Sequence, residues 1–143
     1  MACAVEVLRR KGRQVYSTSP DGTVLEALRL MAEKNVGALV VLSEGNLVGI
    51  FSERDYARKI ARHGDLPRDT PVREIMTPAP IAISPDTELD ECMRLMTDHQ
   101  VRHLPVLEGN NVSGVVSIGD VVKLIIETQK DLVAHLERYI VGR

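Results

Sequence analysis

Residues 49–55 read Gly-Ile-Phe-Ser-Glu-Arg-Asp, and residues 114–120 read Gly-Val-Val-Ser-Ile-Gly-Asp. The two stretches share a glycine, a serine and an aspartate at the same three places and lie 65 positions apart. The same offset relates Ser-Pro-Asp at 19–21 to Ser-Pro-Asp at 84–86. The chain of 143 residues therefore contains two copies of one unit, and such a repeat decides the architecture. We expect any site to occur twice or to lie between the copies.

Within each copy, the residue pattern predicts the element order β-α-β-β-α. In the first copy, a short β-like segment at 14–17 precedes a helix, which begins at the capping box formed by Thr23 and Glu26. The apolar residues of that helix recur with helical spacing. A buried apolar strand at 38–42, a turn and a second strand at 47–51 then predict a hairpin. The second copy repeats this order.

The proline distribution divides the chain. We expect a first repeat at 14–63, a linker at 64–76 with one short helical turn, and a second repeat at 77–127. The last helix is expected at 119–140, because this stretch has no proline and no internal glycine. Its apolar stripe outruns the repeat and needs a partner, either the chain's own surface or a second copy. We favour the second copy, and hence a homodimer.

Composition argues against several classes of protein. The net charge of −2 and the shortage of aromatic residues disfavour a nucleic-acid-binding protein. No apolar run approaches the roughly 20 residues that span a membrane, and residues 1–13 do not have the pattern of a signal peptide. The two cysteines form no disulfide framework, so we expect a cytoplasmic protein. The basic cluster at 9–13 is interpreted as a solvated N-terminal segment.

No pattern indicates catalysis or metal binding. The four histidines lack the spacing of metal ligands, and no motif places a nucleophile beside a general base. We therefore predict no catalytic residues, no metal site and no enzyme activity.

The repeated Gly-h-h-Ser-x-x-Asp pattern, where h is apolar, permits two interpretations. Serine followed three positions later by aspartate can cap a helix, which stabilises it by about 1 kcal/mol. The same residues can also bind a ligand, since the glycine allows close approach and helix N–H groups suit a phosphate. An aspartate there can accept hydrogen bonds from ribose hydroxyls. The pattern alone favours capping.

The repeated unit together with this motif resembles the CBS domain, and two in tandem resemble a Bateman module of the stand-alone bacterial type. The resemblance covers about residues 14–127. It implies an α+β (α/β) fold, in which two tandem β-α-β-β-α repeats pack with pseudo-twofold symmetry, with a long C-terminal helix in addition. It also implies a regulatory protein with no required cofactor. Its ligand would be an adenine nucleotide (AMP, ADP or ATP, with NAD as a further candidate), and its output would go to an effector protein.

The resemblance implies two nucleotide sites between the repeats. In the first, Asp55 would hold the ribose, Ser52 and the helix start would face the phosphate, and basic residues would bind phosphate. In the second, Asp120 and Ser117 would take these roles beside the facing strand. The first site comprises Ser52, Arg54, Asp55, Ile81, Ala82, Arg102 and His103. The second comprises Tyr16, Ser17, Thr18, Ser117 and Asp120.

The two expected sites differ in charge. Glycine or alanine stands at each second-site position that matches Arg54, Arg102 or His103. The first site should therefore prefer a more phosphorylated nucleotide, and the second a neutral adenosine group, a weaker ligand or none. Two alternatives stay open: an interaction module that binds no ligand, and a sensor of S-adenosylmethionine. The basic residues argue against that cationic ligand at the first site.

Overall fold

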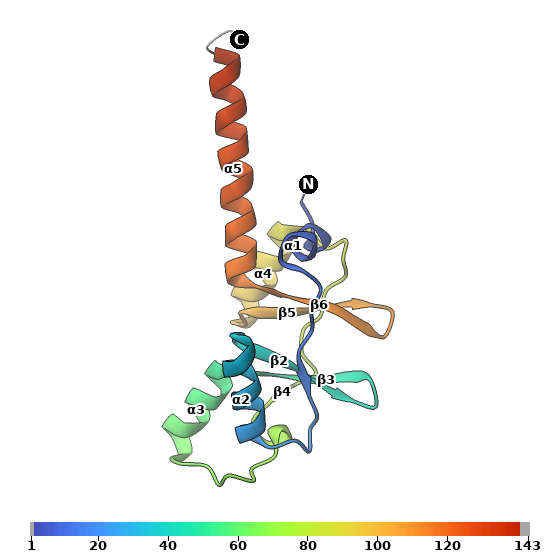
Figure 1. Cartoon of the computed structure of the whole chain (residues 1–143), viewed down its shortest axis with the longest axis vertical. Coiled ribbons are helices and arrows are strands. Elements are labelled where there is room, and N and C mark those ends of the chain that lie inside the picture. The colour runs from blue at the N-terminus through green and yellow to red at the C-terminus, as the bar shows by residue number, and fades with distance from the viewer. Residues whose placement is uncertain (1, 141–143) are drawn as a thin grey trace.

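The computed structural model describes residues 2–140 (Figure 1). Two halves are stacked along the long axis of the molecule, and one helix continues beyond them. The first half contains β1 (Ser17–Thr18), α2 (Val24–Lys34), β2 (Ala38–Ser43), β3 (Asn46–Ser52) and α3 (Glu53–His63). The second half contains α4 (Leu89–His99), β5 (His103–Glu108), β6 (Asn111–Ser117) and α5 (Ile118–Ile140). Three further elements are α1 (Ala4–Lys11), the 3-10 helix η1 (Val72–Glu74) and β4 (Thr77–Pro78).

The expected helices and hairpins form in both copies. Thr23 caps α2, because its side chain accepts a hydrogen bond from the Glu26 N–H at 3.1 Å. Each hairpin is antiparallel, with β2 paired to β3 and β5 paired to β6. The apolar faces of the two repeat helices are buried, as the helical spacing predicted. The buried residues are Val24, Ala27 and Met31 in α2, and Leu89, Cys92 and Met96 in α4. Leu28 is partly buried, whereas Met93, which was also expected in the core, is 37% exposed.

The first strand of each copy is shorter than predicted. Residues 14–16 lie outside β1, which pairs in parallel with β2. In the second copy the matching segment makes only a bridge at Ile83. Val40 N–H donates to the Tyr16 carbonyl at 3.2 Å, whereas Pro105 at the matching position has no N–H. The proline therefore limits the pairing of β5 on this side.

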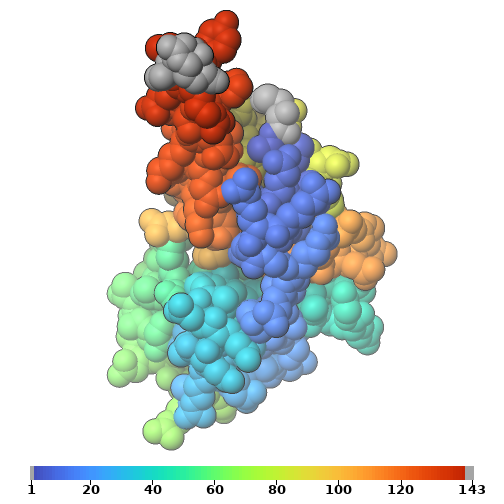
Figure 2. Space-filling model, turned by 45° about the horizontal axis from the view of Figure 1, so that its top comes forward, coloured from blue at the N-terminus to red at the C-terminus, as the bar shows by residue number. Residues whose placement is uncertain are grey.

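The two halves exchange their leading segments. Helix α1 precedes the first repeat in sequence, yet Ala4, Val7 and Leu8 are buried in the core of the second half. Val72 and Ile75 precede the second repeat, yet they complete the core of the first half. Figure 2 shows the blue α1 lying against the orange part of α5. The basic cluster at 9–13 is exposed, as expected for a solvated segment, but Arg9, Arg10 and Lys11 form the last turn of the docked helix α1.

Helix α5 runs through Ile118–Ile140 and leaves the body of the molecule (Figure 1). Val121 and Leu124 are buried in the second core and Ile125 packs against it. The predicted apolar stripe held Ile125 but neither Val121 nor Leu124; it comprised Val122, Ile125, Ile126, Gln129, Leu132, Val133, Leu136, Tyr139 and Ile140. Most of that stripe is exposed instead: Val122, Ile126, Leu132, Val133, Leu136, Tyr139 and Ile140 are 42–80% exposed. Among residues 2–140, no helix is both long enough and apolar enough to cross a bilayer.

Candidate functional site

The end of β3 and the start of α3 form what we call the first corner, centred on Ser52 and Asp55. The Ser52 N–H donates to Asp55 Oδ2 at 2.9 Å, and the Asp55 N–H donates to Ser52 Oγ at 3.2 Å. This is the reciprocal capping box that the motif permitted. Asp55 Oδ1 also accepts a hydrogen bond from the Thr77 hydroxyl of β4 at 3.2 Å. Each of these donors is a neutral group.

Three arginines gather at the first corner. Arg54 and Arg58 lie one turn apart on α3, and Arg102 directly precedes β5. The pKa of Arg54 lies below its ordinary value because Arg58, and then Arg102, repel its charge more than Asp55 attracts it. None of the three arginines forms an ion pair within residues 2–140. An anion bound among them would relieve this repulsion.

A cavity of about 60 Å³ lies at the first corner, between the two copies. Five of the seven residues expected in the first site line it, whereas Ile81 and Ala82 do not. Ile81 packs instead against the core of the second half. The cavity is lined by Ile50, Ser52, Arg54, Asp55, Arg58, Thr77, Gln100, Val101, Arg102 and His103.

The sequence did not predict three polar residues of this cavity, which are Arg58, Thr77 and Gln100. Arg58 follows Arg54 by four positions on the expected helix, so its place on the same helix face could have been predicted. Thr77 was expected as the first residue of the second repeat, directly after the linker. Its contact with Asp55 depends on the pairing of β4 with β3, which no residue pattern in the linker indicated.

The end of β6 and the start of α5 form the second corner, centred on Ser117 and Asp120. The capping geometry is the same: Ser117 N–H donates to Asp120 Oδ2 at 2.9 Å, and Asp120 N–H donates to Ser117 Oγ at 3.1 Å. The additional partner is different. Lys11 Nζ, at the end of α1, lies 2.6 Å from Asp120 Oδ2 and donates to the Val115 carbonyl at 2.9 Å.

This ammonium sets the charge state of the second corner. Burial alone would raise the pKa of Asp120, but hydrogen bonds from Lys11 and from the Ser117 N–H hold that pKa below its ordinary value. The carboxylate is therefore ionised and paired within the chain. Neutral donors face Asp55 at the first corner, whereas a cation faces Asp120.

The facing strand expected for the second site lies elsewhere. Ser17 and Thr18 form β1, which pairs with β2 in the first half. Tyr16 packs against the first core, with Lys34 Nζ 5.7 Å from the centre of its ring. These three residues line neither the cavity at the first corner nor the one beside Asp120.

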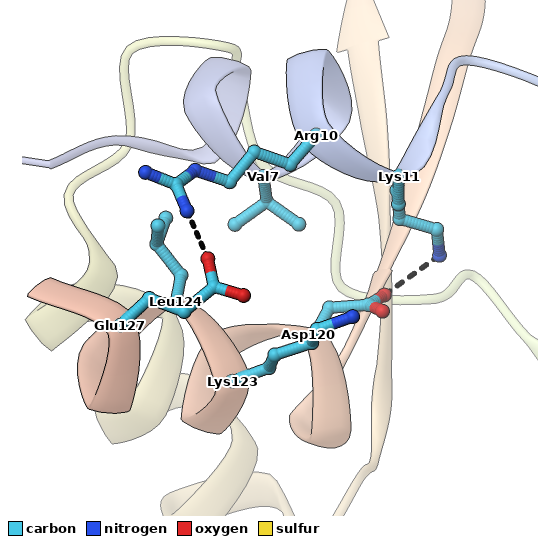
Figure 3. Close-up of a pocket in the computed structure, with 7 residues that line it drawn as sticks. All are labelled: Val7, Arg10, Lys11, Asp120, Lys123, Leu124 and Glu127. Carbon is cyan, nitrogen blue, oxygen red and sulfur yellow. Dashed lines mark hydrogen bonds and ion pairs between the residues drawn. The ribbon is translucent and has the colours of Figure 1, made fainter.

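The cavity beside Asp120 lies between α1 and α5 and has a volume of about 310 Å³ (Figure 3). Two ion pairs bridge these helices: Lys11 with Asp120, and Arg10 with Glu127. Figure 3 shows both pairs reaching from α1 to α5 across the cavity. The cavity is lined by Val7, Arg10, Lys11, Asp120, Lys123, Leu124 and Glu127.

His103 lies between the two corners. It pairs with Ser117 across β5 and β6, and its ring would lie 3.5 Å from a Cβ at Gly37. Burial lowers the pKa of His103, and the charges of Lys11 and Arg102 lower it further against the opposing pull of Asp120 and Asp55. The imidazole is therefore neutral at pH 7. Residues 2–140 hold no group of three or more His, Cys, Asp or Glu side chains that could bind a metal ion.

A family model for the CBS domain matches residues 6–62 and again 72–127. The chain belongs to the CBS-domain family. The two matches and the two stacked halves make it a CBS pair with an additional C-terminal helix, as the resemblance implied. The first match begins inside α1, the helix that packs on the second half.

Solved and curated relatives agree with this assignment. The chain is 43% identical to a CBS-domain protein of Burkholderia ambifaria MC40-6, with a TM-score of 0.85 over 90% of this chain and 96% of that one. It is 38% identical to the CBS domain-containing protein CBSX3, mitochondrial, of Arabidopsis thaliana, over 96% of this chain and 71% of that protein. The CBS pair of protein MJ0100, solved with 5'-methylthioadenosine and S-adenosyl-L-methionine, shares the fold, with a TM-score of 0.79 at 22% identity over 90% of this chain and 98% of that one.

Proposed function

We propose that this CBS pair is a sensor that binds an adenine nucleotide at the first corner and passes the ligand state to an effector protein. AMP, ADP and ATP are the leading ligands, with NAD as a further candidate. One observation carries the proposal: three arginines that form no ion pair with any described residue line the same cavity as a carboxylate that only neutral groups contact. A nucleotide carries the complementary groups, since its phosphates are anionic and its ribose diol donates hydrogen bonds.

Each residue of the first corner has a proposed role. Asp55 accepts the ribose hydroxyls, as an acidic residue does in dinucleotide folds. Ser52 and the first N–H groups of α3 face the phosphate. Arg54 and Arg102 neutralise the phosphate charge, and Arg58 extends the basic surface along α3. Because three cations are present, we expect ATP and ADP to bind more tightly than AMP.

The size of the cavity indicates how binding becomes a signal. Its volume of about 60 Å³ is far below the roughly 300–1,000 Å³ of small-molecule pockets. Ser52 and Asp55 line it from the first copy, while Arg102 and His103 line it from the second. A complete nucleotide therefore has to move the two copies apart. The bound state differs in their relative placement, which an effector protein can recognise.

We further propose that the exposed stripe of α5 contacts a second copy of the chain. Large apolar side chains along one helix need a partner, and those of α5 beyond Ile125 are exposed. Light scattering on the full chain should give a dimer, and Val133→Lys with Leu136→Lys should convert it to a monomer. Asp131→Lys lies off the stripe and should leave the dimer intact. A wild-type monomer would refute this part.

S-adenosylmethionine is the second candidate ligand, since the CBS pair of MJ0100 was solved with it. This ligand is cationic and has no phosphate, so Arg54 and Arg102 disfavour it at the first corner. Lys11 adds a positive charge at the second corner as well. The charges of this chain therefore favour a nucleotide over S-adenosylmethionine.

Calorimetric titration of the full chain with ATP, AMP, NAD and S-adenosylmethionine tests the proposal. We expect ATP to bind at least about tenfold more tightly than AMP, since one charge-assisted contact is worth about 1.5–3 kcal/mol. S-adenosylmethionine should bind weakest. Absence of heat with all four ligands at millimolar concentration would instead support the interaction module that binds no ligand.

A further inference from the structure

The second corner already holds a group that competes with a ligand. Lys11 Nζ contacts Asp120 Oδ2 at 2.6 Å and also donates to the Val115 carbonyl. Lys11 lies outside the repeat that carries Asp120, 109 positions earlier in the chain. Its side chain is 37% exposed and that of Asp120 is 23% exposed, so this ion pair is only partly open to water.

The repeat shows that matching segments of the chain supply different groups to the two aspartates. The offset of 65 residues relates Lys11 to Met76, and Gly12 to Thr77. At the first corner, the neutral Thr77 hydroxyl donates to Asp55. At the second corner, glycine stands at the position that matches Thr77, and the ammonium of the residue before it, Lys11, contacts Asp120 instead. A charge-assisted hydrogen bond is roughly twice as strong as a neutral one. A ribose diol would displace Lys11 less readily than it would displace Thr77.

Packing holds Lys11 in this position. Leu8, one turn earlier on α1, is 1% exposed and lies so close to Gly114 that a Cβ there would be 2.6 Å from Leu8 Cδ2. Ala4 and Val7 are buried in the same core. Arg10 forms a second ion pair to α5, with Glu127. Helix α1 therefore docks on the second half and presents Lys11 to the corner.

We propose that Lys11 is a built-in occupant of the second corner, so that a nucleoside reaches Asp120 only when Lys11 leaves. This inference rests on the proposed function, since it takes the corner motif to be able to bind adenosine ligands. Lys11 acts as a gating residue that determines how many ligands each chain binds. Wild-type protein binds one, at the first corner. Ligand entry at the second corner is coupled to release of the C-terminal end of α1.

Adenosine is the suitable probe, because it has the ribose diol but no phosphate. Its binding at the second corner therefore does not depend on the positive charge that Lys11→Met removes. We would titrate ¹⁵N-labelled full chain and follow the amides of Ser117 and Asp120. Wild type should show no shift of these amides, and Lys11→Met should show saturable shifts. Arg9→Met removes a charge from an exposed position of the same helix and should behave as wild type.

Two further variants complete the test. Lys11→Arg keeps a cation and should keep the corner closed, whereas Lys11→Met combined with Asp120→Asn should lose the new binding. Shifts at Ser117 and Asp120 in wild type, or their absence in Lys11→Met, would overturn the inference. A separate titration with ATP, followed at Ser52 and Asp55, reports on the proposed function. The first corner can therefore succeed or fail independently of the second.

Discussion

The two corners have the same motif and the same capping geometry, yet their carboxylates face different groups. Asp55 and Asp120 each accept a hydrogen bond from the capping serine N–H at 2.9 Å. Asp55 then meets the Thr77 hydroxyl, and three arginines lie nearby. Asp120 instead meets Lys11. The motif thus builds the same helix start twice, and segments outside it decide which group each carboxylate contacts.

Among single substitutions, removing an arginine of the first corner should have the largest effect, because it weakens ATP binding. We expect Arg102→Ala to weaken ATP binding about 10- to 100-fold, since it removes a charge-assisted contact worth about 1.5–3 kcal/mol. Calorimetry on folded protein measures this change. Arg62→Ala, on the same surface of the chain but outside the cavity, serves as control. An unchanged affinity in Arg102→Ala would remove the basic cluster from the proposal.

A side chain at Gly114 should displace Leu8 and weaken the packing of α1 on the second half. A Cβ at Gly114 would lie 2.6 Å from the buried Leu8 side chain, so Gly114→Ala should lower the free energy of unfolding by about 1–3 kcal/mol. Gly119→Ala is the control, because its Cβ would meet only Ser117 Oγ at 3.8 Å. Urea denaturation of both variants measures the difference. Equal stability of the two variants would mean that α1 is not tightly docked.

His103 should make stability fall as the solution becomes acidic. Because its folded-state pKa is lowered, the unfolded chain takes up the proton first as pH falls through about 6.5. We expect the free energy of unfolding to fall by on the order of 1 kcal/mol between pH 7 and 5. His103→Gln should reduce this slope, whereas the exposed His99→Gln should retain it. A slope unchanged by His103→Gln would contradict the assignment.

Loss of the Lys11 ion pair should have the smallest effect on stability. Lys11→Met should lower the free energy of unfolding at pH 7 by about 0.5 kcal/mol, as expected for a partly exposed pair. Because the pKa of Asp120 is lowered in the folded chain, its carboxylate stabilises the fold at pH values above the ordinary pKa of aspartate. This contribution is lost as pH falls through the lowered pKa. The difference from wild type should therefore begin to shrink below about pH 4 and vanish only once pH is below the lowered pKa of Asp120. Urea denaturation of both proteins between pH 7 and 3 measures this difference. A difference that stays constant over that range would argue against the pairing.

The repeat allowed much of the fold to be predicted, because periodic apolar residues and turn residues determine the helices and hairpins locally. Helix α1 was missed because it has only 8 residues, too few to be stable without the packing of Val7 and Leu8. Ile81 and Ala82, which were expected in the first site, do not line the cavity. Pairing of β4 with β3 brings Thr77 to the first cavity instead. The contact of Lys11 with Asp120 joins segments that no local pattern relates.

The central claim is that the two corners are unequal, and one pair of variants tests it most directly. Asp55→Asn and Asp120→Asn each remove one carboxylate charge while keeping the side chain's shape and an oxygen that can accept the capping bond. We predict that wild type binds one ATP per chain by calorimetry. Asp55→Asn should abolish this binding, and Asp120→Asn should leave its affinity and stoichiometry unchanged. Two equivalent ATP molecules per chain, or equal losses in both variants, would contradict the account.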